Sequence, residues 1–216
     1  MSKKIYIAVV LFLVAGQTFG QGFKFGVLFD PTITWLRSDV SDVSRENARI
    51  GFDLGMSADY YFSQNYAVSS GVSLFNMGGT LNYADGIILN TKDGNISVAK
   101  NGNVKYKVQY IKIPAAFKFK THMIGRIVYS ANLGFDPMIR VSTRASYSDV
   151  KNVKANKETK LFNFGCHFGV GAHYSLGEDA SIFGGLSFMN TLVDMTKPAH
   201  DKITSNNLIF RIGVMF

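Results

Sequence analysis

Apolar residues occupy every second position from Ile50 to Phe62, where the chain reads IGFDLGMSADYYF. Gly, Ser, Asp and one Tyr take the positions between them. A two-sided pattern of this kind predicts a β-strand with one face in an apolar medium and the other in a polar one. Strands of soluble proteins most often have about 5–6 residues, whereas a tilted strand that crosses an outer membrane needs about 9–11. The segment is therefore typical of a transmembrane β-barrel strand.

The same alternation recurs along the chain, and we expect eight strands in all. They run over about 23–36, 50–62, 66–77, a stretch ending in 111–119, 127–141, 161–176, 181–192 and 208–216. The connections alternate in length: those near 63–65, 121–125 and 177–179 are short, and those near 37–48, 78–105, 143–160 and 193–206 are long and polar. Short periplasmic turns and long extracellular loops are typical of outer-membrane barrels. The predicted fold is all-β: an eight-stranded antiparallel up-and-down transmembrane β-barrel.

The start of the chain is typical of a signal peptide. Two lysines precede an apolar run over residues 5–15, and residues 18–20 offer small side chains at the outer positions of a cleavage site. The apolar run is too short for a transmembrane helix. We therefore expect residues 1–20 to be cleaved during export, and residues 21–216 to form one barrel domain that is integral to the outer membrane.

The inner faces of the predicted strands combine many small residues with a few charged ones. Eight strands leave an interior that is only wide enough for its own side chains. A buried charge without a partner costs roughly 3–5 kcal/mol, so these groups are expected to pair. We predict a closed lumen with an internal network of ion pairs. The candidate members are Lys24, Asp30, Arg49, Asp53, Asp59, Lys112, Lys118, Asp136, Arg140 and Arg211.

One short motif occurs twice. Phe29-Asp30-Pro31 in the first predicted strand matches Phe135-Asp136-Pro137 in the fifth. Proline cannot donate to a strand ladder, so each motif is expected at a β-bulge. Two interpretations remain open: the motifs are similar bulges that end regular pairing, or the two aspartates face each other across the lumen and anchor Arg49 and Arg140.

The charge of the chain favours a lipid partner over nucleic acid. The formal net charge is +8, and it falls to +6 when Lys3 and Lys4 leave with the signal peptide. A basic balance often indicates nucleic-acid binding, but an exported chain does not meet nucleic acid. Anionic outer-membrane lipid, including lipopolysaccharide, is the expected partner. Within the 143–160 loop, basic residues recur at every third position and form either a ridge for phosphates or for an acidic protein, or a solvated loop: Lys151, Lys154, Lys157 and Lys160.

The 78–105 loop carries turn signals of its own. It contains Asp93-Gly94 and Asn101-Gly102, and such dipeptides are frequent in β-hairpins. Either the flanking strands extend beyond the membrane, or the loop holds a separate hairpin. Long loops of this kind are where partner binding is expected.

The sequence offers no convincing catalytic or metal site. His167 and His173 share one predicted face but stand six residues apart, which places them roughly 20 Å from each other and too far apart to hold one metal. No Ser, His and acid set lies clearly at one height of the predicted barrel. We therefore predict no catalytic residue, no metal and no cofactor, and a lipid-modifying enzyme is a lesser alternative.

The end of the chain resembles an assembly signal. Phe216 closes the alternating segment Leu208–Phe216, which is similar to the C-terminal signal that the barrel assembly machinery recognises. That machinery is therefore an expected partner during biogenesis.

The segment Gln109–Lys120, QYIKIPAAFKFK, resembles the Y-[IL]-x-[IL]-P-x-x-x-K strand of the PorT-like outer-membrane barrels of Bacteroidota. Residues 25–27, 132–134 and 211–214 resemble further parts of that family, so the resemblance covers essentially the whole mature chain. The family's namesake serves the type IX secretion system, and the shared motif carries no catalytic residue. The resemblance implies a non-enzymatic barrel that acts as a structural or accessory subunit of an envelope complex, such as secretion or gliding machinery. A stand-alone binding or adhesion barrel that uses its long loops is the alternative.

Overall fold

The computed structural model describes residues 22–91, 94–148, 150–177, 180–196 and 202–216. The described chain is almost entirely strand: β1 (Phe23–Ser38), β2 (Val43–Asn47), β3 (Arg49–Ser63), β4 (Tyr66–Tyr83), β5 (Ile87–Thr91), β6 (Gly94–Val98), β7 (Gly102–Lys112), β8 (Ala115–Lys120), β9 (Ile127–Tyr147), β10 (Val150–Lys154), β11 (Phe162–Ser175), β12 (Ser181–Thr191) and β13 (Ile203–Met215). None of the helices among the described residues has the length and apolarity needed to cross a membrane. The predicted signal peptide lies outside the described residues.

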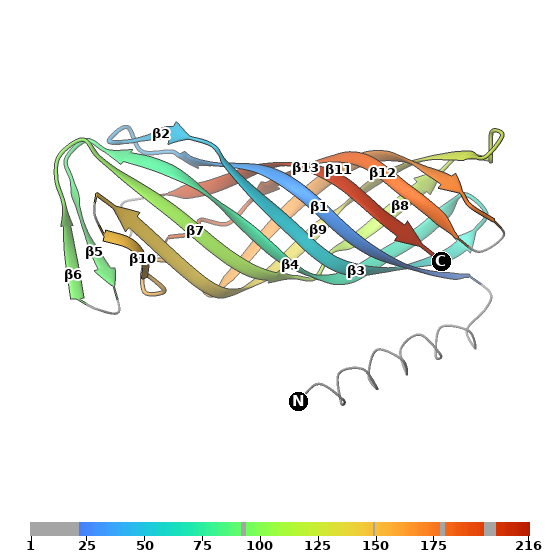
Figure 1. Cartoon of the computed structure of the whole chain (residues 1–216), viewed down its shortest axis with the longest axis horizontal. Coiled ribbons are helices and arrows are strands. Elements are labelled where there is room, and N and C mark those ends of the chain that lie inside the picture. The colour runs from blue at the N-terminus through green and yellow to red at the C-terminus, as the bar shows by residue number, and fades with distance from the viewer. Residues whose placement is uncertain (1–21, 92–93, 149, 178–179, 197–201) are drawn as a thin grey trace, which may run out of the picture.

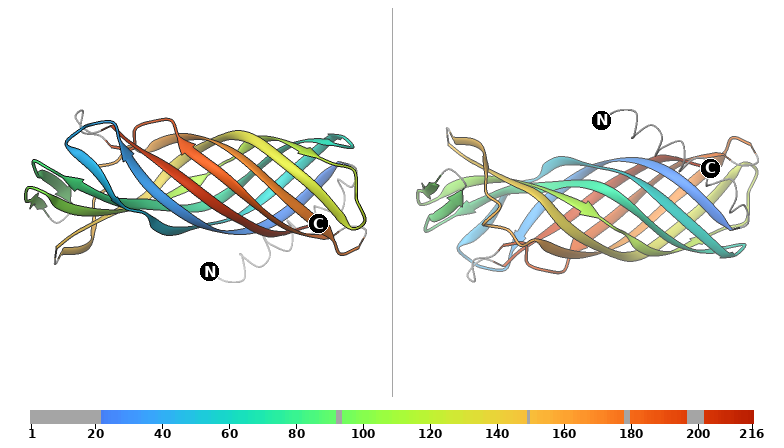
Figure 2. Two further views of the ribbon diagram at one scale, coloured as in Figure 1. Left: turned by 90° about the horizontal axis from the view of Figure 1, so that it is seen from above. Right: turned by 90° about the horizontal axis from the view of Figure 1, so that it is seen from below.

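Antiparallel strands close into a ring, as Figures 1 and 2 show. Its order is β1-β3-β4-β7/β8-β9-β11-β12-β13, and β13 pairs again with β1. Strands β7 and β8 share one place in the ring, because both pair with β4 and β9 and are separated only around Pro114. The predicted eight-stranded antiparallel up-and-down barrel is therefore confirmed.

The two faces of the ring have opposite character. On β3 the predicted outer residues Ile50, Phe52 and Leu54 are exposed, and Asp53 between them is buried. A wide apolar outer surface is stable in lipid, where a closed ring also leaves no backbone group without a partner. The exposed apolar residues therefore form a belt around the barrel, which we call the apolar belt.

One end of the barrel carries additional structure and is here named the loop end. Strand β2 extends the ladder along β4, β10 extends it along β9, and β5 with β6 forms a separate two-stranded sheet. Figure 1 shows these four strands together, with the C-terminus toward the opposite end, here named the terminus end. Both open interpretations of the 78–105 loop are thus realised, because β4 and β7 extend beyond the expected strands and a hairpin lies between them.

The repeated Asp-Pro motif does not create bulges. The pairing of β1 with β13 stops after Leu28 and resumes at Thr32 in the same register, and the backbone N–H of Ile212 donates to the Asp30 carboxylate at 2.9 Å. Around Pro137 the pairing of β9 passes from β7 to β8 in one register, from Lys112 opposite Met138 to Ala115 opposite Phe135. The expectation of bulges was wrong because the ladder is interrupted near each proline without an inserted residue.

Candidate functional site

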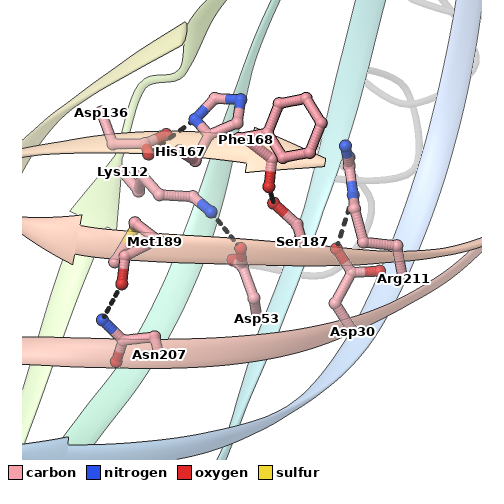
Figure 3. A network of polar contacts seen from close by, with 10 residues as sticks. All are labelled: Asp30, Asp53, Lys112, Asp136, His167, Phe168, Ser187, Met189, Asn207 and Arg211. Carbon is pink, nitrogen blue, oxygen red and sulfur yellow. Dashed lines mark hydrogen bonds and ion pairs between the residues drawn. The ribbon is translucent and has the colours of Figure 1, made fainter. Parts of the chain in front are cut away.

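The barrel interior holds a row of ion pairs across its middle, drawn in Figure 3. Lys112 Nζ donates to Asp53 Oδ2, and Arg211 Nε lies 3.4 Å from Asp30 Oδ2. Closer to the terminus end, Lys118 Nζ lies 2.7 Å from Asp59 Oδ2. Since Asp30 stands opposite Asp53 in the register of β1 and β3, two adjacent carboxylates are matched by two cations from other strands.

Hydrogen bonds and aromatic rings complete this layer. The Ser69 hydroxyl donates to Asp59 Oδ1 at 2.5 Å. The Lys118 ammonium and the Arg211 guanidinium lie 5.6 Å and 5.3 Å from the centre of the Phe183 ring. A cation over an aromatic face gains electrostatic stabilisation, and more so where water is excluded. The inner charges are therefore held by several elements at once.

The row of ion pairs also contains a histidine, which was not predicted from the sequence to belong to it. His167 Nδ1 lies 2.7 Å from Asp136 Oδ2, and both side chains are largely buried. Asp136 therefore pairs with β11 and not with a partner across the lumen. The sequence indicated only that His167 points into the lumen, because it shares its strand face with Gly165 and Gly169. Its height relative to Asp136 depends on the register of β9 and β11, which is not evident from the sequence.

Three candidates lie outside this row. Arg140 donates to the carbonyls of Asn156 and Thr159 in the connection after β10, so it does not bind Asp136. Arg49 lines a groove on the outer surface. Lys24 lines a pocket at the terminus end with Lys120 and Arg126. Asp30 and Asp136 line one interior cavity, but the hypothesis that they anchor Arg49 and Arg140 was wrong, because Asp30 pairs with Arg211 and Asp136 with His167.

A serine lies in the same interior region as the Asp136–His167 pair. Ser187 lines, with both of them, a cavity of about 50 Å³. Its hydroxyl donates to the Phe168 carbonyl at 3.1 Å, as Figure 3 shows. The sequence placed no Ser, His and acid set clearly at one height, whereas Ser187, His167 and Asp136 line the same cavity. The cavity has room for about one or two water molecules but not for a lipid.

An apolar cluster fills the interior from the ion pairs to the loop end. Phe75 and Tyr110 stand opposite each other on β4 and β7 and are completely buried. Buried methionines from β9 and β12, Met138 and Met189, pack in the same cluster. We call this cluster the apolar plug. The inner face is therefore polar near the middle of the barrel and apolar at the loop end.

The four loop lysines have different surroundings. Lys160 pairs with Asp194 at 3.1 Å, Lys151 lines the groove that contains Arg49, and Lys154 and Lys157 are exposed. Phe216 exchanges two backbone hydrogen bonds with Phe25, each 2.8 Å long. Its role as an assembly signal stays a prediction.

Asp194 anchors the connection between β12 and β13 and gives a pH-dependent prediction. Burial alone raises the pKa of Asp194, but the backbone N–H groups of Thr196 and Ile203, each at 3.0 Å, and the Lys160 ammonium hold the pKa below its ordinary value. The stabilisation is therefore complete above about pH 3.9 and is lost as the pH falls through the lowered pKa.

We expect the amide proton resonance of Ile203, followed by NMR in micelles, to titrate with a midpoint below about 3.9. The Asp194→Asn variant should abolish this titration while the resonances of β3 remain in place. A midpoint at or above 3.9 in the wild-type protein would contradict the arrangement.

Comparison with known proteins agrees with this architecture. A family model described as "Outer membrane protein beta-barrel domain" matches residues 15–197. Among solved structures, the outer membrane protein OprG from Pseudomonas aeruginosa is similar with a TM-score of 0.51 at 12% identity, over 90% of this chain and 94% of that one. Neisserial surface protein A has a TM-score of 0.49 at 12% identity, over 88% and 95% of the two chains. No curated protein matches the sequence.

Proposed function

Because this chain belongs to the outer membrane protein beta-barrel domain family and is an integral outer-membrane β-barrel, we propose that it is a closed, non-enzymatic barrel that serves an envelope complex as a structural or accessory subunit. On this proposal the loop end faces the cell exterior and the terminus end faces the periplasm, as in other outer-membrane barrels. The partner binds the loop end.

One observation carries the proposal: the interior is filled, while a folded extension projects from the loop end. Ion pairs and the apolar plug occupy the inside of the ring. The β5–β6 hairpin is joined to the plug through Leu89 and Val98, yet its Ile88 side chain is 61% exposed. An exposed apolar side chain on a structured extension is suited to contact with another protein.

The strand Gln109–Lys120 supports a more specific version. Because this segment resembles the PorT-like barrels, we propose a secretion or gliding complex as the first candidate assembly. Lys112 and Lys118 of this strand hold interior carboxylates, which agrees with a structural role for the motif. The stand-alone adhesion barrel differs from this proposal only in its partner, which would lie on another cell or in the medium.

The lipid-modifying enzyme receives one supporting observation, the shared cavity of Asp136, His167 and Ser187. A hydrolase needs its serine next to the imidazole and needs space for the scissile bond. Here the serine hydroxyl is bound to a backbone carbonyl, and the cavity is about 50 Å³ and enclosed by the ring. We therefore assign the Asp136–His167 pair to interior stability.

A pull-down from native outer membranes tests the proposal. Full-length tagged protein should retain a reproducible, stoichiometric set of partner chains in mild detergent. The Ile88→Asp variant should lose at least about nine-tenths of the partner, because a buried unpaired carboxylate at an interface costs several kcal/mol, roughly 2–5. The matched control, Gln64→Asp, introduces the same charge in the exposed turn at the terminus end and should retain the partner. Recovery of a lone barrel from the wild type would contradict the accessory role.

A further inference from the structure

A cationic groove lies on the outer surface of the barrel at the loop end. Its volume is about 630 Å³, and it is formed by parts of β3, β7, β9 and β10 and the β9–β10 turn. We call it the outer groove. Its lining residues are Arg49, Ile50, Lys105, Lys107, Ser146, Tyr147, Ser148, Lys151 and Asn152. Four of these side chains are cationic, and none of the described lining residues is acidic.

The two lysines of β7 face outward because the strand pattern requires it. On β7, Lys105 and Lys107 alternate with Val104, Tyr106 and Val108, which are buried in the apolar plug. Arg49 follows the break between β2 and β3, where the Thr34 hydroxyl on β1 bonds both the N–H and the carbonyl of Gly78 on β4. At this level β1 therefore contacts β4 directly, and Arg49 is not part of the interior row. Lys107 also stands opposite Arg144 on β9, which adds a fifth cation beside the groove.

The far wall of the groove is held by hydrogen bonds. The backbone N–H of Asn152 donates to Ser146 Oγ at 2.9 Å, and Ala99 N–H donates to the Tyr147 hydroxyl oxygen at 3.0 Å. Ser148, directly after β9, and Asn152, within β10, have positive φ values of 50° and 56°. The wall that carries the Ser146 and Tyr147 hydroxyls is thus positioned before any ligand binds, which lowers the ordering cost of binding.

The groove meets the apolar belt at its lower edge. Ile50 is 80% exposed and lines the groove, and it pairs with the exposed Ile33 on β1. On β9, Val141 is 48% exposed, and Arg144 follows three residues later toward the loop end. Apolar side chains therefore give way to cations within about 10 Å along a strand, at the rise of about 3.3 Å per residue. An apolar surface followed by a cationic one matches a lipid whose acyl chains lie below a phosphate.

We propose that the outer groove binds the phosphate of a phosphorylated outer-leaflet glycolipid, with Ile50 against its acyl region. A Lys or Arg near a membrane surface contributes about 1 kcal/mol of attraction to anionic lipid, so several converging cations select phosphate strongly. A soluble anion would leave the exposed Ile50 without an apolar contact, whereas the acyl region of a membrane lipid provides one. The membrane lipid is therefore the ligand. The site is separate from Ile88 and from any protein partner at the hairpin.

Native mass spectrometry of the full-length protein in detergent tests the site. The probes are a bisphosphorylated lipid A, the same lipid without phosphates, and inorganic phosphate. The wild-type protein should bind the bisphosphorylated lipid, and the Lys105→Gln/Lys107→Gln variant should bind it roughly tenfold or more weakly. The control, Lys100→Gln/Lys157→Gln, removes two exposed charges outside the groove and should stay within about twofold of wild type. Heat-dependent mobility on gels verifies that each variant is folded.

Four results would overturn the proposal. Binding that is unchanged in the groove variant removes the lysines from the site, and an equal loss in the control variant means that only total charge matters. Equal binding of the dephosphorylated lipid removes the phosphate from recognition. Displacement of the lipid by inorganic phosphate at the same concentration makes the ligand a free anion.

Discussion

Replacing Lys118 with Met is expected to lower the free energy of unfolding by about 3–5 kcal/mol. Lys118 and Asp59 form a pair 2.7 Å apart whose side chains are 8% and 1% exposed. Without the ammonium, the Asp59 carboxylate retains the Ser69 hydroxyl but no ion-pair partner at hydrogen-bond distance among the described residues. The low dielectric inside the ring makes an uncompensated charge costly.

A urea titration in lipid vesicles measures this loss, with the single tryptophan, Trp35, as the fluorescent reporter. The double variant Asp59→Leu/Lys118→Met should recover most of the stability, because replacing a whole buried pair by apolar residues is often neutral. The surface control Lys157→Met should stay within about 0.5 kcal/mol of wild type. A Lys118→Met barrel that unfolds within 1 kcal/mol of wild type, or a double variant that is less stable than the single one, would contradict an essential interior pair.

The strand faces were predictable because the alternation of side chains is local. Ile50, Phe52 and Leu54 alternate with Gly51 and Asp53 whatever their partners are, so lipid and lumen faces follow from the sequence. The partners of the inner charges were not predictable, because the height of one strand relative to another depends on the register around the whole ring. This is why Asp136 was expected opposite Asp30 and is bound to His167.

The partners of the two arginines were not predictable from strand alternation. Arg140 stands opposite the buried Tyr110 on the inner side of β9, and its guanidinium donates to carbonyls in the connection after β10. Arg49 begins β3 and lines the groove that contains Lys105 and Lys107. The positions of connections and strand ends depend on tertiary packing, which the alternation of side chains does not record.

The apolar plug was missed because the expected strands ended too early. Residues 78–105 were interpreted as a long polar loop, although Leu81, Tyr83 and Val104 alternate with polar residues at its two ends. Beyond the membrane the outer face meets water and the inner face becomes an ordinary apolar core. The alternation therefore continues, but the apolar side chains now lie on the inner face and the polar ones on the outer face. Only the structure shows where this change occurs.

The second large expected effect is that the barrel conducts no ions, because its lumen is closed. A measurable current would be the opposite result. Water-filled channels require wider rings of about 16–18 strands, and eight strands leave space only for side chains. Here the interior combines three Lys/Arg–Asp pairs and the Asp136–His167 pair with a plug whose Phe75 and Tyr110 are fully buried. Ion passage would require the plug and the pairs to separate together.

The most direct test is the conductance of the purified, refolded protein in a planar lipid bilayer, with a general porin as the positive control. Insertion of the barrel should produce no steady current above that of the bare bilayer. Reproducible, unitary conductance steps that depend on the inserted protein would contradict the closed lumen, and with it the assignment of function to the outer surface.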